Sequence, residues 1–194
     1  PPTERIVRLL SSKVGPVRAA AVRMLRQGRH RGVSETIIPL LMDSHEPCVA
    51  EAIRLLVASG RGVTVSEAID IVGRCDGDAA IEAARSLCRH GARTAVPALI
   101  EALPRKSEEL TRAELLAAAA KLDFAQAEPR ILALLDEKKE PAVALYALVR
   151  TRDPSHVELI LKGCTTVNYF SRSPIPFMDE DFDADLAACI PAER

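Results

Sequence analysis

The chain has 194 residues, of which 48% are hydrophobic and 27% charged, and its formal net charge is −1. This balance is typical of a folded globular protein rather than a disordered chain, and no apolar run reaches the ~18 residues needed to cross a bilayer. Aromatic residues are scarce and tryptophan is absent. The apolar content is mainly alanine, leucine, valine and isoleucine, which suits closely packed helices.

The two ends of the chain differ in charge. Residues 1–33 carry eight Lys/Arg and one acidic residue, whereas residues 163–194 carry two basic and six acidic residues. This asymmetry predicts electrostatic contact with a partner, or between the ends of neighbouring molecules. The chain starts on two prolines and shows no signal-peptide pattern, so we expect a fragment of a longer protein or a processed chain.

Five cysteines are spread along the chain at wide, irregular intervals. Their number and spacing argue against a disulfide framework and against a CxxC metal site. We therefore expect buried thiols in a reducing compartment, and a cytoplasmic location. The cysteines are Cys48, Cys75, Cys88, Cys164 and Cys189.

An apolar triplet with i, i+1, i+4 spacing recurs every 31 or 32 residues, which is the first sign of an internal repeat. Each triplet forms one face of a short helix, and we call these segments the A helices. The triplets begin at Ile6, Ile37, Ala68, Leu99 and Ile131.

A second apolar series lies between the A helices, with i, i+4, i+8 spacing and a small residue in the middle. It begins at Val17, Cys48 and Ala79, again 31 residues apart. The small central residue allows two helices to approach closely. We call these segments the B helices, and we expect two more over residues 111–122 and 141–150, followed by a sixth A helix over 155–164.

Helix-terminating residues agree with both series. Gly28, Gly60 and Gly91 follow B helices, where a glycine in the left-handed conformation commonly ends a helix. We also expect N-caps at Ser34, Asp76 and Asp153.

The sequence therefore predicts an all-α fold of about five helical hairpins plus the sixth A helix and an irregular C-terminal tail. One hairpin cannot bury its apolar faces alone, but a stack of hairpins can. We expect a repeat array over residues 3–164 and a tail over 165–194.

Three segments resemble the HEAT-like repeats of phycobilisome-lyase-type proteins. They are GPVRAAAVRML at 15–25, IPLLMD at 38–43 and VPALIEAL at 96–103. The resemblance covers about residues 3–164 and weakens after 105. It implies a right-handed α-solenoid whose B helices line the concave side, in a family made up mostly of scaffolds and adaptors.

An arginine recurs at one B-helix position, as Arg23, Arg54 and Arg85, so stacking would form a column of arginines. Such a column, with Arg18 and Arg26 at its basic end, could grip acidic side chains or phosphates. The alternative is a solvated ridge, because glutamates lie three residues before Arg54 and Arg85, at ordinary ion-pair spacing.

The tail carries most of the chain's aromatic residues. Phe177 and Phe182 lie there beside several aspartates, and residues 178–190 have an apolar helical face. The segment either caps the last repeat or serves as a partner-binding arm. Phe177 and Phe182 are therefore candidate contact residues.

We expect a non-enzymatic protein-interaction scaffold that binds a protein partner through the B-helix surface and the tail, and the arginines would suit an acidic partner. No catalytic, cofactor or metal site is predicted, since His45-Glu46 is a lone pair and no nucleophile motif is present. The basic segment 23–31 raises nucleic-acid binding as an alternative, but the pI of about 6.5 and the lack of interleaved aromatics argue against it. A subunit of a HEAT-like lyase that presents a chromophore or small molecule is the other alternative.

Overall fold

The computed structural model describes residues 2–30, 32–136, 140–167 and 180–190. Within these ranges the chain is all-helical and has no β-strand, which confirms the all-α part of the predicted fold class. None of the described helices is long and apolar enough to span a membrane.

The chain divides into two compact units, Pro1–His90 and Gly91–Arg194. The division falls inside the predicted 3–164 array, between the third B helix and the fourth A helix. Unit 1 contains α1 Pro2–Leu9, α2 Gly15–Gln27, α3 Ser34–Ile37, η1 Ile38–Met42, α4 Glu46–Ala58, α5 Val65–Arg74 and α6 Gly77–His90. Unit 2 contains η2 Arg93–Ala95, α7 Val96–Ala102, η3 Leu103–Arg105, α8 Glu109–Leu122, α9 Phe124–Asp136, α10 Pro141–Arg150, η4 Pro154–His156, α11 Val157–Val167 and α12 Glu180–Cys189.

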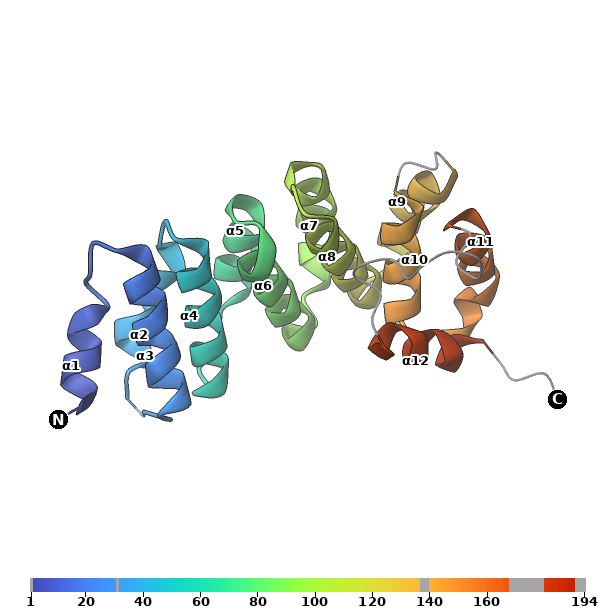
Figure 1. Cartoon of the computed structure of the whole chain (residues 1–194). Coiled ribbons are helices and arrows are strands. Elements are labelled where there is room, and N and C mark those ends of the chain that lie inside the picture. The colour runs from blue at the N-terminus through green and yellow to red at the C-terminus, as the bar shows by residue number, and fades with distance from the viewer. Residues whose placement is uncertain (1, 31, 137–139, 168–179, 191–194) are drawn as a thin grey trace. The chain divides into compact units, whose positions relative to one another are not determined.

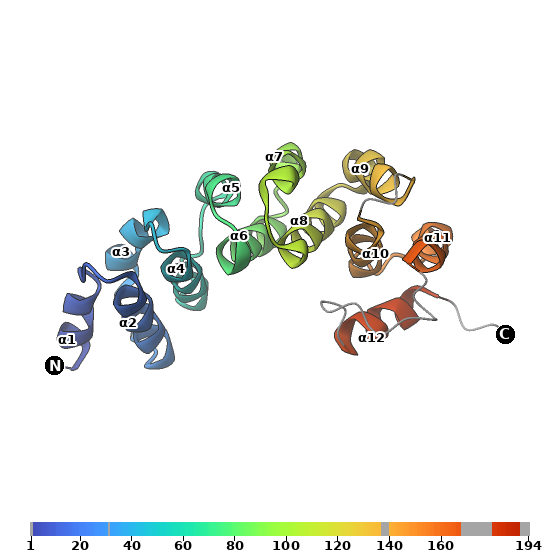
Figure 2. The ribbon, with the colours of Figure 1, turned by 45° about the horizontal axis from the view of Figure 1, so that its top comes forward.

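Unit 1 is built in two layers (Figures 1 and 2). The B helices α2, α4 and α6 form one layer, in which α4 packs against both of its neighbours. The A segments α1, α3–η1 and α5 form the other layer, each packed on a B helix.

Unit 2 has a similar arrangement. Its B helices α8 and α10 pack on each other, and the A helices α7, α9 and α11 pack in sequence against them. The last helix, α12, crosses one end of α10 and does not continue the alternation of A and B helices (Figure 1).

The core lies between the two layers of each unit, at the positions that the triplets predict. In the second to fifth A helices the first and third residues of each triplet are buried, and the middle residue is half-buried. The second and third residues of each B series are fully buried, including Leu25, Leu56 and Leu87. The helix faces predicted from these residues are therefore the buried faces, except that Ile6 of the first triplet and Val17 of the first B series are only half-buried.

Prolines divide two of the A segments into α and 3₁₀ pieces. Pro39 lies at the start of η1, and Pro97 and Pro104 lie at the starts of α7 and η3. A proline lacks the backbone N–H of a continuous helix, so it is tolerated where a helical piece begins.

Two of the predicted helix ends are wrong. Gly28 has a right-handed φ of −74°, and Arg29 after it carries the positive φ of +50°. Gly28 is small for another reason: a Cβ there would lie 2.5 Å from Nε2 of His30. Ser34 is the first residue of α3 rather than its N-cap, which is Val33.

The other predicted ends agree with the structure. Gly60 and Gly91 have positive φ after α4 and α6. Asp153 caps η4 by accepting a hydrogen bond from the Ser155 N–H, and Asp76 directly precedes α6. The sequence analysis missed a capping box at the start of α5, where Thr64 and Glu67 hold each other's backbone N–H.

Candidate interaction surface

Arg18 joins α2 to the segment that precedes α4. Its Nε and Nη2 each lie 2.6 Å from an Asp43 carboxylate oxygen, and its Nη1 donates to the Ser12 carbonyl at 2.7 Å. Both side chains are largely buried, and the hydrogen bonds from Arg18 hold the pKa of Asp43 below its ordinary value. Arg18 therefore stabilises the fold, and it does not lie on an open surface as the predicted partner-binding role requires.

The predicted arginine column exists in unit 1 as a ladder in which arginine and glutamate alternate between neighbouring B helices. Arg23 Nε lies 3.1 Å from Glu51 Oε1, and Arg54 Nε lies 3.1 Å from Glu82 Oε1. Both pairs join residues 28 positions apart, so one geometry repeats along α2, α4 and α6. Each of these ion pairs links a B helix to the next B helix.

The intrahelical pairs expected from the sequence are present as well. Arg54 and Arg85 each lie 3.4 Å from the glutamate three residues earlier. Arg54 also contacts Asp78 at 2.8 Å, so it faces three carboxylates. Arg54 is thus neutralised by its own surroundings and stabilises the stack.

At the α2 end of the ladder, the arginines that surround Glu51 carry more positive charge than the nearby carboxylates balance. The Glu51 side chain is only 3% exposed, and Arg23, Arg26 and Arg54 all contact it. Arg26 uses both Nε and Nη2, each 3.2 Å from Oε2. Arg54 also contacts Glu82 and Asp78, so the positive surplus lies on Arg23 and Arg26, which share Glu51. The Arg23 side chain is 55% exposed.

A hollow of about 710 Å³ opens beside this cluster, at the C-terminal ends of α2 and α4. We call it the α2–α4 hollow. Its walls combine apolar residues with basic and hydroxyl side chains, and its lining includes Leu25, Arg26, Arg29, His30, Ser34 and Ser59.

The two serines of the hollow are already engaged. Ser34 donates to Ser59, which donates in turn to the Leu56 carbonyl. Because each hydroxyl has one hydrogen, neither can donate to a further group. Arg26 and Arg29 supply guanidinium donors for an anion in the hollow.

The aromatic tail residues do not join this surface. Phe182 on α12 is fully buried and stacks on Tyr146 of α10, with ring centroids 5.9 Å apart. Its position is that of a capping residue. Phe177 lies outside the described residues.

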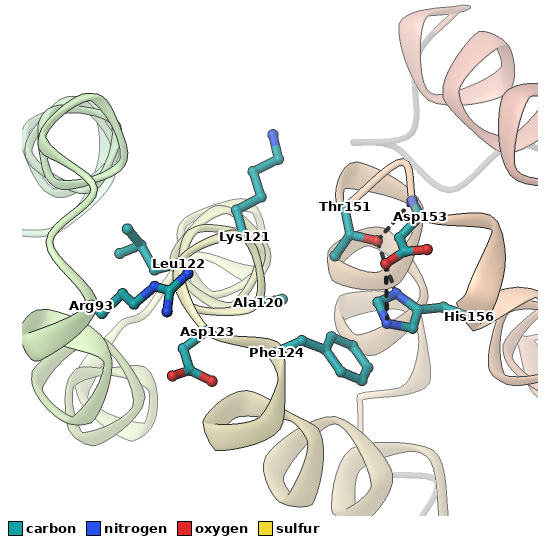
Figure 3. A pocket seen from close by; sticks show the side chains of 9 residues that line it. All are labelled: Arg93, Ala120, Lys121, Leu122, Asp123, Phe124, Thr151, Asp153 and His156. Carbon is teal, nitrogen blue, oxygen red and sulfur yellow. Dashed lines mark hydrogen bonds and ion pairs between the residues drawn. The ribbon is translucent and has the colours of Figure 1, made fainter.

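A second hollow, of about 360 Å³, lies in unit 2 where successive B helices turn into A helices (Figure 3). His156 stacks on Phe124 at 3.7 Å, and its Nδ1 lies 3.1 Å from Thr151 Oγ1. The Thr151 hydroxyl donates to the Leu148 carbonyl, so the ring nitrogen has to be the donor. This polarity is the reverse of what a base-activated nucleophile needs, and the pair holds the junction together.

Other groups that carry chemistry in enzymes also have structural surroundings. His45 precedes α4 and packs against Gly15, while Glu46 accepts the Asp76 N–H. All five cysteines are free thiols, and burial raises the pKa of Cys48 to about 12. The described residues contain no group of three or more His, Cys, Asp or Glu arranged to hold a metal.

Sequence reasoning underrated Glu51 and Arg29. The 31-residue register contained the signal for Arg29, since counting back from Gly91 and Gly60 leads to Arg29 and not to Gly28. The role of Glu51 as a shared carboxylate depends on the contact between α2 and α4, which no local spacing shows.

Comparisons of the chain with protein-family models, with curated proteins and with solved structures find no match.

Proposed function

We propose that this protein is a non-enzymatic interaction scaffold that binds an acidic protein partner through the B-helix surface of unit 1. Its hairpins would belong to a right-handed α-solenoid of the HEAT-like kind, as the motifs at 15–25, 38–43 and 96–103 suggest. The A triplets present in both units support this architecture.

One observation carries the proposal. At the α2 end of the ladder, Arg23 and Arg26 share the buried Glu51, which Arg54 also contacts, beside an open hollow. Exposed ion pairs on a helix surface contribute little to stability and need no further explanation. A surplus of partly exposed guanidinium groups beside a hollow suits recognition of carboxylates instead, because arginine can bind them through two parallel hydrogen bonds.

Affinity capture with purified chain tests this function. The variant reverses the charge of the two half-exposed column residues, as Arg23→Glu with Arg85→Glu, and leaves Arg54 intact because it holds three carboxylates. We expect the main captured protein to be lost, and its capture by the intact chain to weaken as salt rises.

The control variant is Arg105→Glu with Arg93→Glu, which makes the same charge change on exposed residues of unit 2. Thermal unfolding of each variant separates lost binding from lost folding. Equal capture by the intact chain and the column variant would remove the B-helix surface from consideration. Loss of the partner after nuclease treatment would indicate a nucleic acid instead.

A further inference from the structure

Two helix ends in this chain share an uncommon backbone feature. Arg29 and Arg152, with φ of +50° and +54°, are the only non-glycine residues with positive φ among those the structure describes. Each lies one residue beyond the C-cap of a B helix, α2 or α10, and donates its N–H to the carbonyl three residues back. Glycine is the usual residue at this position, because a side chain there is strained.

At α10 the arginine has an evident use. Arg152 Nη2 lies 2.6 Å from Asp185 Oδ1, and Arg150 Nη1 lies 2.9 Å from Asp185 Oδ2. Asp185 belongs to α12, so two arginines at the end of a B helix grip one carboxylate of an acidic helix. The Asp185 side chain is only 5% exposed in this grip.

At α2 the same device is present without its carboxylate. Arg29 is exposed, and its guanidinium group makes no ion pair or hydrogen bond with any described residue. Arg26 lies three residues earlier in the same hollow, and Glu51 contacts only its Nε and Nη2. A strained arginine whose side chain has no partner among the described residues of its unit is more readily explained by a ligand than by stability.

We propose that the α2–α4 hollow is a carboxylate-binding site for an acidic helical segment of a partner protein, gripped by Arg29 and Arg26. The inference rests on the proposed function and names the part of the surface that makes the contact. α12 shows the chemistry of the occupant: Asp185 enters the grip, while Phe182 and Leu186 beside it are buried. Of the apolar lining residues Ala58 is exposed, whereas Leu25 and Leu55 are buried, so the two arginines are the main groups that the hollow offers to the segment.

The test uses the intact chain and a labelled peptide with the sequence of residues 180–190, carrying Cys189→Ser. Binding is followed by fluorescence anisotropy. We expect Arg29→Gly to weaken binding at least fivefold, while Lys13→Gly, which removes the same charge from an exposed turn of unit 1, changes it less than twofold. A peptide with Asp185→Asn should lose a similar amount of affinity for the intact chain and almost none for Arg29→Gly.

Arg29→Gly also protects the test from a folding artefact. Glycine suits the positive φ, so this variant should unfold roughly 2–4 °C higher than the intact chain while it binds less. If Arg29 had only a structural role, its replacement would not raise the unfolding temperature and weaken binding at the same time. Arg29→Lys, which keeps the charge without the planar fork, should recover part of the affinity.

Equal peptide affinity in the intact chain and Arg29→Gly overturns the proposal, as does the absence of binding to the intact chain. A short RNA oligomer that binds more tightly than the peptide, and is released by Arg29→Gly, would also overturn it by assigning the hollow to nucleic acid. If the peptide result is negative but the Arg23 and Arg85 column variant still loses its captured partner, the proposed function stands and only this site fails.

Discussion

The C-terminal ends of α2 and α10 are built alike and differ in what faces them. Both end in a left-handed arginine held by the same backbone hydrogen bond, with a second arginine two or three residues earlier. At α10 the pair holds Asp185 of α12, whereas at α2 the hollow is open. The comparison teaches that the same pair of arginines at the end of a B helix can hold a terminal helix in one unit and offer a binding site in the other.

The largest effect is expected where α12 attaches to α10. Phe182→Ala removes a fully buried ring stacked on Tyr146, so it should lower the free energy of unfolding by about 3–5 kcal/mol. Urea unfolding measures the loss. Leu161→Ala, on the exposed side of α11, is the control and should cost less than about 1 kcal/mol. A similar small cost at Phe182 would mean that α12 is not a cap.

The next effect concerns the mostly buried pair at the other end of α2. Arg18→Ala leaves the Asp43 carboxylate without its bidentate partner, and we expect a loss of about 3 kcal/mol in the free energy of unfolding. Combining it with Asp43→Ala should cost less than the sum of the two single changes. Strict additivity in this double-mutant cycle would contradict the pairing.

Acid should weaken both arginine grips. Hydrogen bonds from Arg18 lower the pKa of Asp43; for Asp185, burial acts in the opposite direction, but hydrogen bonds from Arg150 and Arg152 still keep its pKa below the ordinary value. A lowered folded-state pKa means that the stabilisation is complete at neutral pH and is lost as the pH falls below the ordinary value of 3.8. Unfolding free energies from pH 7 to about 2 should therefore fall less steeply for Asp43→Asn with Asp185→Asn.

The smallest effect separates the two left-handed arginines. Arg29→Gly should stabilise the chain by about 1 kcal/mol, because glycine adopts a positive φ without strain. Arg152→Gly relieves the same strain but loses the ion pair with Asp185. Because the Arg152 side chain is largely exposed, that ion pair is weak, and the net gain in the free energy of unfolding should be smaller than for Arg29→Gly but not zero. Equal gains in urea unfolding would show that Asp185 does not distinguish the two helix ends.

Much of the fold was predictable from the sequence because repeats make the local pattern and the packing coincide. The residues that open and close the A triplets, such as Leu99 and Leu103, are buried because the helix face they define is the face that stacks. The fifth B helix covers residues 141–150 as predicted, since Pro141 fixes its first turn.

The contacts between helices were less predictable. The i, i+3 pair of Glu82 and Arg85 follows from helical spacing, but the 28-residue pair of Arg54 and Glu82 depends on how α4 lies against α6. The grip on Asp185 joins segments 35 residues apart. Such pairs require the relative placement of helices, which a hydrophobic period does not contain.

The sequence was sufficient to predict the positive charge of the site but not the contacts of its side chains. The arginine column and the basic end of α2 follow from the 31-residue register, whereas the burial of Arg18 and the surplus around Glu51 follow from tertiary contacts. Gly28 and Arg29 show the limit most clearly, because both fit the end of a B helix and only the backbone shows which of them is left-handed.

The most direct measurement is NMR mapping of the intact chain, labelled with ¹⁵N, during titration with the peptide of residues 180–190. If the α2–α4 hollow receives an acidic helix, the largest shifts will fall on amides of residues 25–30 and 55–59, and Arg29→Gly will move them to at least fivefold higher peptide concentration. Shifts confined to α10 and α12, or none in unit 1 at saturating peptide, would contradict the account.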